Sequence, residues 1–177
     1  MSAVENLYII DTSSLIQIKD RYPARKLPGL WVDLNTLIVN KRLIAPDEVK
    51  KEILDGDDEL VPWVHDHAPM FHDNSSLIGI TQNPVLEKFP DMANYNSEKK
   101  HHADPFVIAL GLALTANPQK SLISYDPIIV SDEKSDLIKN PKLPFSQIKK
   151  IPDVCNYFKL KCIDHLELFK LEGFRFH

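Results

Sequence analysis

The chain has 177 residues, of which 44% are hydrophobic and 26% are charged, and its formal net charge is −4. This length suits one domain with its own hydrophobic core, so we expect a single domain over residues 1–177. No apolar run approaches the roughly 18 residues of a membrane span, and no secretory signal opens the chain. We therefore expect a cytoplasmic protein with no membrane partner. The weakly acidic balance gives no support for nucleic-acid binding, but it does not exclude a local basic patch.

The most informative stretch lies near the start of the chain. The apolar run Leu7–Ile10 predicts a buried strand, which Asp11 ends. Thr12, Ser13 and Ser14 follow, and each can cap the helix that the next apolar residues predict. In open α/β sheets, ligands bind at the carboxyl ends of the strands, and a carboxylate beside hydroxyls suits a hydrated divalent cation. Taken alone, Asp11 fits a helix cap equally well.

A basic loop comes next, over residues 19–29, where prolines and a glycine interrupt the helical pattern. It carries Arg21, Arg25 and Lys26 around Tyr22. Cationic side chains beside an aromatic ring are typical of RNA-backbone contacts. A solvated surface loop accounts for the same residues.

Alternating helical and strand patterns fill the first half of the chain. Helices are predicted at 30–40, from 46–48 onward with Val49, Ile53 and Leu54 as the buried stripe, at 60–67, and at 85–95 with a break at 89–90. Strands are predicted at 43–45 and around 77–80.

The second half opens with a strongly apolar helix that begins after Asp104, which we expect to be the N-cap, with Pro105 in the first helical position. Separate strands are predicted at 122–123, 128–130 and 161–163, and helices at 151–158 and from Asp164 to Gly173. Strands that alternate with helices predict a three-layer α/β fold with a small, mostly parallel sheet of about four or five strands.

Four predicted element boundaries carry an acid: Asp11, Glu52, Asp104, and either Glu133 or Asp132. Carboxylates gathered at one point repel each other unless a cation lies among them. Ligands that are all oxygen favour Mg²⁺ or Mn²⁺, and such a site can activate water against a phosphodiester. Spacing alone does not establish that the four acids converge.

The order of these elements adds a resemblance to a known family. The stretches that carry it are YIIDTSSLI, APDEVKKEI, ADPFVIALGLAL and IIVSDEK, followed by IPDVC near the C-terminus. The sequence resembles PIN-domain proteins, the fold of VapC-type toxin ribonucleases, and IPDVC suggests an uncharacterised subgroup of them. The resemblance implies a three-layer α/β/α fold and a Mg²⁺- or Mn²⁺-dependent endoribonuclease.

The same resemblance implies roles for individual residues. Asp11, Glu52, Asp104 and Glu133 match the acids that hold the metal and carry catalysis. Ser13 matches the hydroxyl that orders the first acid. Thr12 and Ser13 can cap the helix by themselves, so we expect the Asp11 carboxylate to be free to face the sheet edge.

Two of these positions have alternatives. Glu48 lies one turn before Glu52 on the same predicted helix face. The fourth acid is Glu133 if the family pattern of hydroxyl, any residue, acid begins at Ser131. Asp132 and Asp126 are the competing matches for that position.

The implied partners follow from the family. They are an RNA substrate, an antitoxin protein and often a second copy of the chain in a homodimer. Candidate RNA contacts are Arg21, Arg25, Lys26 and Lys100, the last beside His101 and His102. Competing hypotheses are a catalytically weak PIN-fold module that binds RNA or acts as a scaffold, and a structure-specific DNA nuclease.

Overall fold

The computed structural model describes residues 4–56, 59–93, 100–116 and 124–176. Within these ranges five strands form one sheet in the order β3-β2-β1-β4-β5, and every neighbouring pair is parallel. The strands are β1 (Val4–Ile10), β2 (Leu43–Pro46), β3 (Phe71–His72), β4 (Ser124–Val130) and β5 (Lys161–Ile163). The predicted α/β class and small sheet are confirmed, and the sheet is parallel throughout.

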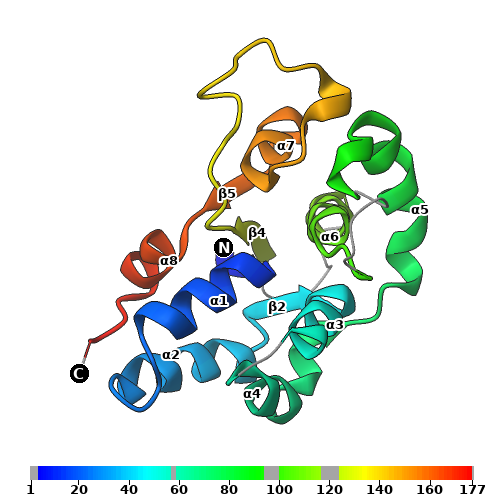
Figure 1. Cartoon of the computed structure of the whole chain (residues 1–177). Coiled ribbons are helices and arrows are strands. Elements are labelled where there is room, and N and C mark those ends of the chain that lie inside the picture. The colour runs from blue at the N-terminus through cyan, green and yellow to red at the C-terminus, as the bar shows by residue number, and fades with distance from the viewer. Residues whose placement is uncertain (1–3, 57–58, 94–99, 117–123, 177) are drawn as a thin grey trace.

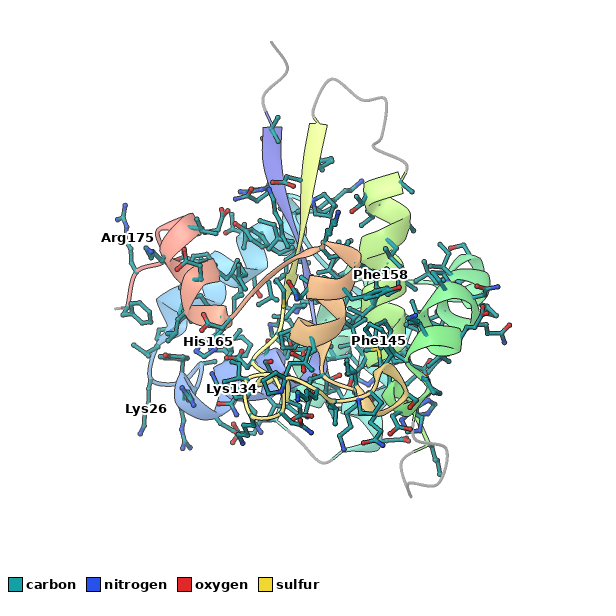
Figure 2. The ribbon with its side chains drawn as sticks, turned by 90° about the horizontal axis from the view of Figure 1, so that it is seen from above. Lys26, Lys134, Phe145, Phe158, His165 and Arg175 are labelled. Carbon is teal, nitrogen blue, oxygen red and sulfur yellow. The ribbon has the colours of Figure 1, made fainter. Side chains whose placement is uncertain are left out.

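Helices cover both faces of this sheet. They are α1 (Thr12–Arg21), α2 (Pro28–Val39), α3 (Asp47–Asp55), α4 (Leu60–Asp66), α5 (Ile78–Ile80), α6 (Asp104–Ala116), α7 (Ile151–Phe158) and α8 (His165–Glu172). Short 3₁₀-helices form at η1 (Ala68–Met70), η2 (Ser75–Leu77), η4 (Pro90–Met92) and η5 (Phe145–Gln147), and η3 (Thr81–Leu86) is a π-helix. In Figures 1 and 2, α2 and α8 lie on one side of the sheet and α5 and α6 on the other, as a three-layer fold requires. No helix in the described ranges is long and apolar enough to cross a membrane.

The centre of the molecule is β1 with α6 packed nearby. Tyr8, Ile9 and Ile10 are fully buried, because β1 lies between two strands and has helices on both faces. Gly111 lets α6 approach β4 closely, since a Cβ there would lie 3.0 Å from Cδ1 of Ile129. This close packing fixes the position of α6 against the central strands of the sheet.

Some predicted boundaries were wrong. Residues 125–127, expected to separate two strands, lie inside the single strand β4, whereas 122–123 fall outside the described residues. Pro127 is tolerated there because β5 pairs with β4 only from Ile128 onward, so no partner on that side needs the missing N–H. Leu54, expected in the buried stripe of α3, is 38% exposed.

The predicted strand around 77–80 is helical, in η2 and α5, and the edge strand is β3 instead. A short apolar run fits a buried strand and a helical turn equally well, and here the helical turn forms. The helix expected at 85–95 is broken into η3 and η4, and residues 94–95 lie outside the described ranges.

Candidate functional site

The carboxyl ends of β1 and β4 lie side by side. Ile10 pairs with Val130, and the Asp11 amide donates a 3.1 Å hydrogen bond to the Val130 carbonyl. Asp11 and Ser131 are therefore the first residues beyond two adjacent parallel strands. In such sheets this edge is where ligands bind.

Asp11 is the N-cap of α1, because its Oδ1 accepts a 2.7 Å hydrogen bond from the Ser14 amide. The expectation that Thr12 and Ser13 would cap this helix and leave Asp11 free was therefore wrong. Since α1 begins at Thr12, the capping position falls on the preceding residue. The second oxygen, Oδ2, accepts the hydroxyls of Ser13 and Ser131, both at 2.7 Å.

The Asp11 carboxylate is only 1% exposed, and burial raises its pKa to about 6. Its three donors, from Ser13, Ser14 and Ser131, are all neutral, and no cation contacts it in the part of the chain that the structure describes. A buried negative charge with neutral partners alone is costly to maintain. This carboxylate would be stabilised by a cation at the sheet edge.

Glu52 reaches the same edge from α3. Its Oε2 accepts the Thr12 hydroxyl at 2.6 Å, and its Oε1 accepts the Ala103 amide at 3.1 Å. Asp104 follows Ala103 directly and is the first residue of α6. One carboxylate thus links the start of α1 to the start of α6, and it brings Asp11, Glu52 and Asp104 into one neighbourhood.

Asp104 lies one residue further into the helix than predicted. The Ala103 carbonyl accepts the amides of Phe106 and Val107, so Ala103 precedes the helix and Asp104 is its first residue. Pro105 has no amide to donate, and it fits the second helical position as well as the first. Asp104 remains in the first turn, where the helix dipole favours an acid.

Glu133 is held at the start of α7. Its Oε1 accepts Nζ of Lys150 at 2.8 Å, and its Oε2 accepts the Ile151 amide at 2.8 Å. Its own amide donates to Oγ of Ser131 at 3.3 Å, the same hydroxyl that binds Asp11. The fourth predicted acid therefore lies beside the others, but a lysine neutralises its charge.

The two alternatives for the fourth acid have other partners. Oδ1 of Asp132 lies 2.6 Å from Nδ1 of the buried His165. Asp126 forms an ion pair with Lys161 and is paired in register with Asn6, toward the opposite end of the sheet. Asp126 is thus the one candidate that the fold separates from the edge.

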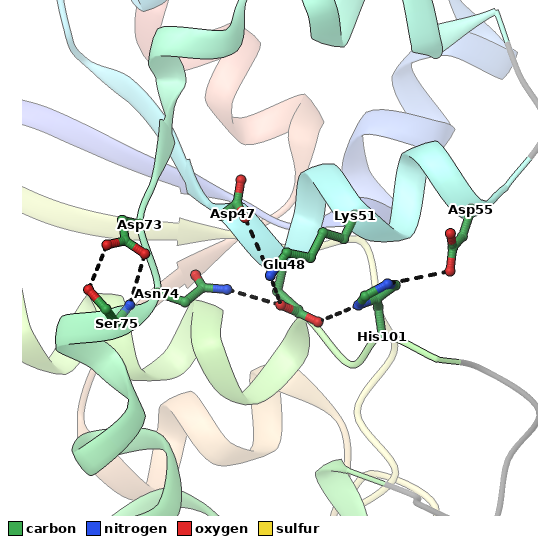
Figure 3. Close-up of polar contacts among 8 residues, drawn as sticks. All are labelled: Asp47, Glu48, Lys51, Asp55, Asp73, Asn74, Ser75 and His101. Carbon is green, nitrogen blue, oxygen red and sulfur yellow. Dashed lines mark hydrogen bonds and ion pairs between the residues drawn. The ribbon is translucent and has the colours of Figure 1, made fainter.

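Glu48 is part of a separate polar cluster on α3 (Figure 3). Its carboxylate lies 2.6 Å from Nδ1 of His101 and 3.0 Å from both Nζ of Lys51 and Nδ2 of Asn74. Burial raises the pKa of Glu48, but the bonds from His101 and Lys51 outweigh burial and hold it below its usual value. Glu48 is already satisfied, so Glu52 is the acid of α3 with neutral partners.

The donor set and the geometry can be compared with a metal site. Carboxylates and hydroxyls at one edge are the ligand type that Mg²⁺ and Mn²⁺ prefer, so the chemistry of the set fits such an ion. Within the described residues, however, no three His, Cys, Asp or Glu side chains are grouped closely enough to hold a metal ion. The acids are interleaved with serine and threonine hydroxyls and with Lys150, which hold them in place.

The predicted RNA contacts divide into two places. Lys100 is exposed and lines a cavity of about 560 Å³ together with Thr12, Glu52 and His101. Arg21 ends α1, whose first turn is at Asp11, so roughly 15 Å of helix separates the basic loop from the edge. The structure brings Lys100 to the site, whereas Arg21 lies at the far end of α1.

Two partners of the candidate acids, Lys150 and His165, were not predicted from the sequence. Each binds an acid that follows β4, yet they lie 17 and 33 residues along the chain from those acids. A cation just before the Ile-Pro start of a helix was the only signal for Lys150, and we find none for His165.

Fold and site together define an α/β protein whose parallel sheet gathers acids and hydroxyls at its carboxyl edge. The chain belongs to the family described as a domain of unknown function (DUF4411), whose model matches residues 8–176. No curated protein and no solved structure matches the chain.

Proposed function

We propose that this protein is a Mg²⁺- or Mn²⁺-dependent endoribonuclease of the PIN type, with Asp11, Glu52, Asp104 and Glu133 as its metal-binding acids. The observation that carries the proposal is the buried Asp11 carboxylate, which has neutral donors only and lies at the sheet edge where Glu52 and Asp104 also lie. Carboxylates in this arrangement repel one another, and a divalent cation relieves the repulsion.

In this proposal the side chains at the sheet edge have different roles. A bound divalent cation supplies the Lewis acid that activates water and neutralises charge on the phosphodiester. Ser13 and Ser131 orient Oδ2 of Asp11, and Thr12 orients Oε2 of Glu52, so both acids are held in place before any ligand binds. Nζ of Lys150 lies 2.8 Å from Oε1 of Glu133 and adds a cation beside the proposed metal-binding acids.

The resemblance to VapC-type toxins supports a biological role. We propose a cytoplasmic toxin of a type II toxin–antitoxin pair, which acts on cellular RNA, is inhibited by an antitoxin protein and forms a homodimer. Inducible expression of the wild-type chain should then arrest growth, and the Asp11→Asn variant should not.

The direct test is cleavage of RNA by purified protein with Mn²⁺ and with EDTA. Asp11→Asn and Asp104→Asn should each lower the cleavage rate on the order of a hundredfold or more, with circular dichroism unchanged. Asp126→Asn is the matched control, because it removes a carboxylate from β4 at the far end of the sheet. Full metal-dependent cleavage by both site variants would overturn the proposal.

One observation favours the alternative, a PIN-fold RNA-binding module without activity. Glu133 is neutralised by Lys150, and no three acids of the described residues are grouped tightly. Such a module would bind RNA but leave it intact with Mg²⁺ or Mn²⁺ present, and its binding would not respond to Asp11→Asn. The same cleavage assay therefore separates the two functions.

A further inference from the structure

Positive charge is concentrated in one part of this acidic chain. Residues 137–163 contain six lysines and one acidic residue, Asp153, whereas the whole chain has a net charge of −4. Asp153 is buried and bonds to Ser135 and nearby backbone amides, so it does not face the solvent. Lys150 and Lys161 are paired with Glu133 and Asp126, so the positive charge of this segment comes from the other four lysines.

Two exposed aromatic rings lie within the same segment. Phe145 in η5 and Tyr157 on α7 are 47% and 44% exposed, and their ring centroids lie 5.2 Å apart. The buried Phe89 supports both rings, with centroids at 5.8 Å from Phe145 and 5.1 Å from Tyr157. Figure 2 shows Phe145 beside α7, whose last residue is Phe158. The two rings are thus supported by Phe89 and partly exposed to solvent.

Cations accompany these rings. Nζ of Lys88 lies 4.5 Å from the Phe145 centroid and 5.6 Å from the Tyr157 centroid. Lys142, Lys149 and Lys159 flank the two aromatic residues in the sequence and are exposed. Neither a salt bridge nor a hydrogen bond involves the side chains of these three lysines in the ranges that the structure describes. We call Lys88, Lys142, Phe145, Lys149, Tyr157 and Lys159 the aromatic–lysine surface.

The aromatic–lysine surface is connected to the acidic edge. The segment that carries it begins after β4, and it returns to the edge where Lys150 and the Ile151 amide bind Glu133. Lys149 is therefore the direct neighbour of a residue at the acidic edge. The cationic segment therefore reaches the acidic edge at Lys150.

We propose that the aromatic–lysine surface binds single-stranded RNA, with bases stacked on Phe145 and Tyr157 and phosphates beside the lysines. This inference rests on the proposed function and adds the place where the strand is held outside the acidic edge. Exposed rings interleaved with lysines suit single strands, because every unpaired base offers a face for stacking and every linkage offers a negative charge. The bases of a duplex are stacked within the helix and cannot use the rings.

The test is binding of a fluorescein-labelled 20-nucleotide single-stranded RNA in EDTA, measured by fluorescence anisotropy. Phe145→Leu and Tyr157→Leu keep an apolar side chain over Phe89 but remove the ring face. Each should weaken binding by about fivefold or more, and Phe145→Trp should bind at least as tightly as the wild type. Lys142→Gln with Lys149→Gln should weaken binding and lower the salt dependence by about two phosphate contacts.

Matched controls are Phe176→Leu and Lys170→Gln, which alter an exposed ring after α8 and an exposed lysine on α8. Both should bind RNA like the wild type. Binding that is unchanged in the Leu variants, or competed equally well by duplex RNA of the same length, would overturn the proposal. Because the binding assay contains no metal, its result does not depend on cleavage. If the Leu variants bind RNA more weakly but the wild type shows no nuclease activity, the RNA-binding surface is retained and the proposed function is rejected.

Discussion

The acids near the carboxyl edge of the sheet fall into two groups, which differ in the side chains that bind them. Asp11 and Glu52 accept hydrogen bonds from hydroxyls and amides alone. Glu48 lies one turn before Glu52 and is bonded to His101 and Lys51. Glu133 lies two residues after Ser131 and is bonded to Lys150. The same residue type is thus neutralised in one group and left with its charge uncompensated in the other.

This difference separates acids that stabilise the fold from acids available to a ligand. An acid paired with lysine already has its counterion, and removing either partner leaves a charge without compensation. An acid held by hydroxyls is oriented but keeps an unbalanced charge, which a metal ion can satisfy. The comparison therefore favours Asp11 and Glu52 over Glu48 as ligands of the proposed metal site.

The largest expected contrast is between Glu52→Gln and Glu48→Gln. Glu52→Gln should reduce RNA cleavage on the order of a hundredfold with little change in the free energy of unfolding. Glu48→Gln should reduce cleavage less than tenfold but lower the free energy of unfolding by about 1 to 3 kcal/mol, because it weakens a part-buried network around His101. Urea unfolding and initial cleavage rates provide both numbers, and the reverse pattern would make Glu48 the site acid.

The pH dependence of stability tests the uncompensated charge on Asp11. Its pKa is about 6 in the folded protein and lower in the unfolded chain, so the folded state binds the proton more tightly. In EDTA, the wild type should lose up to about 3 kcal/mol relative to Asp11→Asn as the pH rises from about 4 through 6, and no more above that. Adding Mn²⁺ at pH 7 should restore stability in the wild type only. If the free energy of unfolding changed with pH in the same way in both proteins, the buried charge assigned to Asp11 would be contradicted.

The smallest expected effect concerns Glu133. It is paired with a lysine, as Glu48 is, but it lies beside Ser131 at the sheet edge, as Asp11 does. If it is a metal ligand, Lys150→Gln removes a competing cation and should tighten Mn²⁺ binding severalfold, as measured by calorimetry. Lys149→Gln, an equal change in charge on the neighbouring residue, is the control. Equal Mn²⁺ affinities in the two variants would make Glu133 a cap of α7 and no more.

Much of the architecture could be predicted, because it follows from local patterns. The apolar run before Asp11 and the β-branched run before Ser131 both form strands, and parallel strands bring their carboxyl ends to one edge. That rule alone places Asp11 and Ser131 together across a separation of 120 residues. Asp164 and Gly173 likewise cap α8 as expected, because caps depend on a few adjacent residues.

Side-chain partners could not be predicted, because they depend on packing between distant elements. Nothing near Glu133 in the sequence indicates that Lys150 will neutralise it, and nothing near Asp132 indicates His165. Boundaries failed for a related reason. Whether 77–80 becomes a strand or a helical turn depends on which neighbours are available, and β2 pairs with β3 instead.

The strand order also governs when this site can exist during protein synthesis. β1 and β2 are translated before β4, the other neighbour of β1, and the Ser131 hydroxyl that binds Asp11 comes 120 residues after that acid. Until then one side of β1 has no partner strand, and Asp11 lacks the hydrogen bond from Ser131. A growing chain therefore carries Asp11 long before it can complete the edge, which assembles only after Ser131 has been translated.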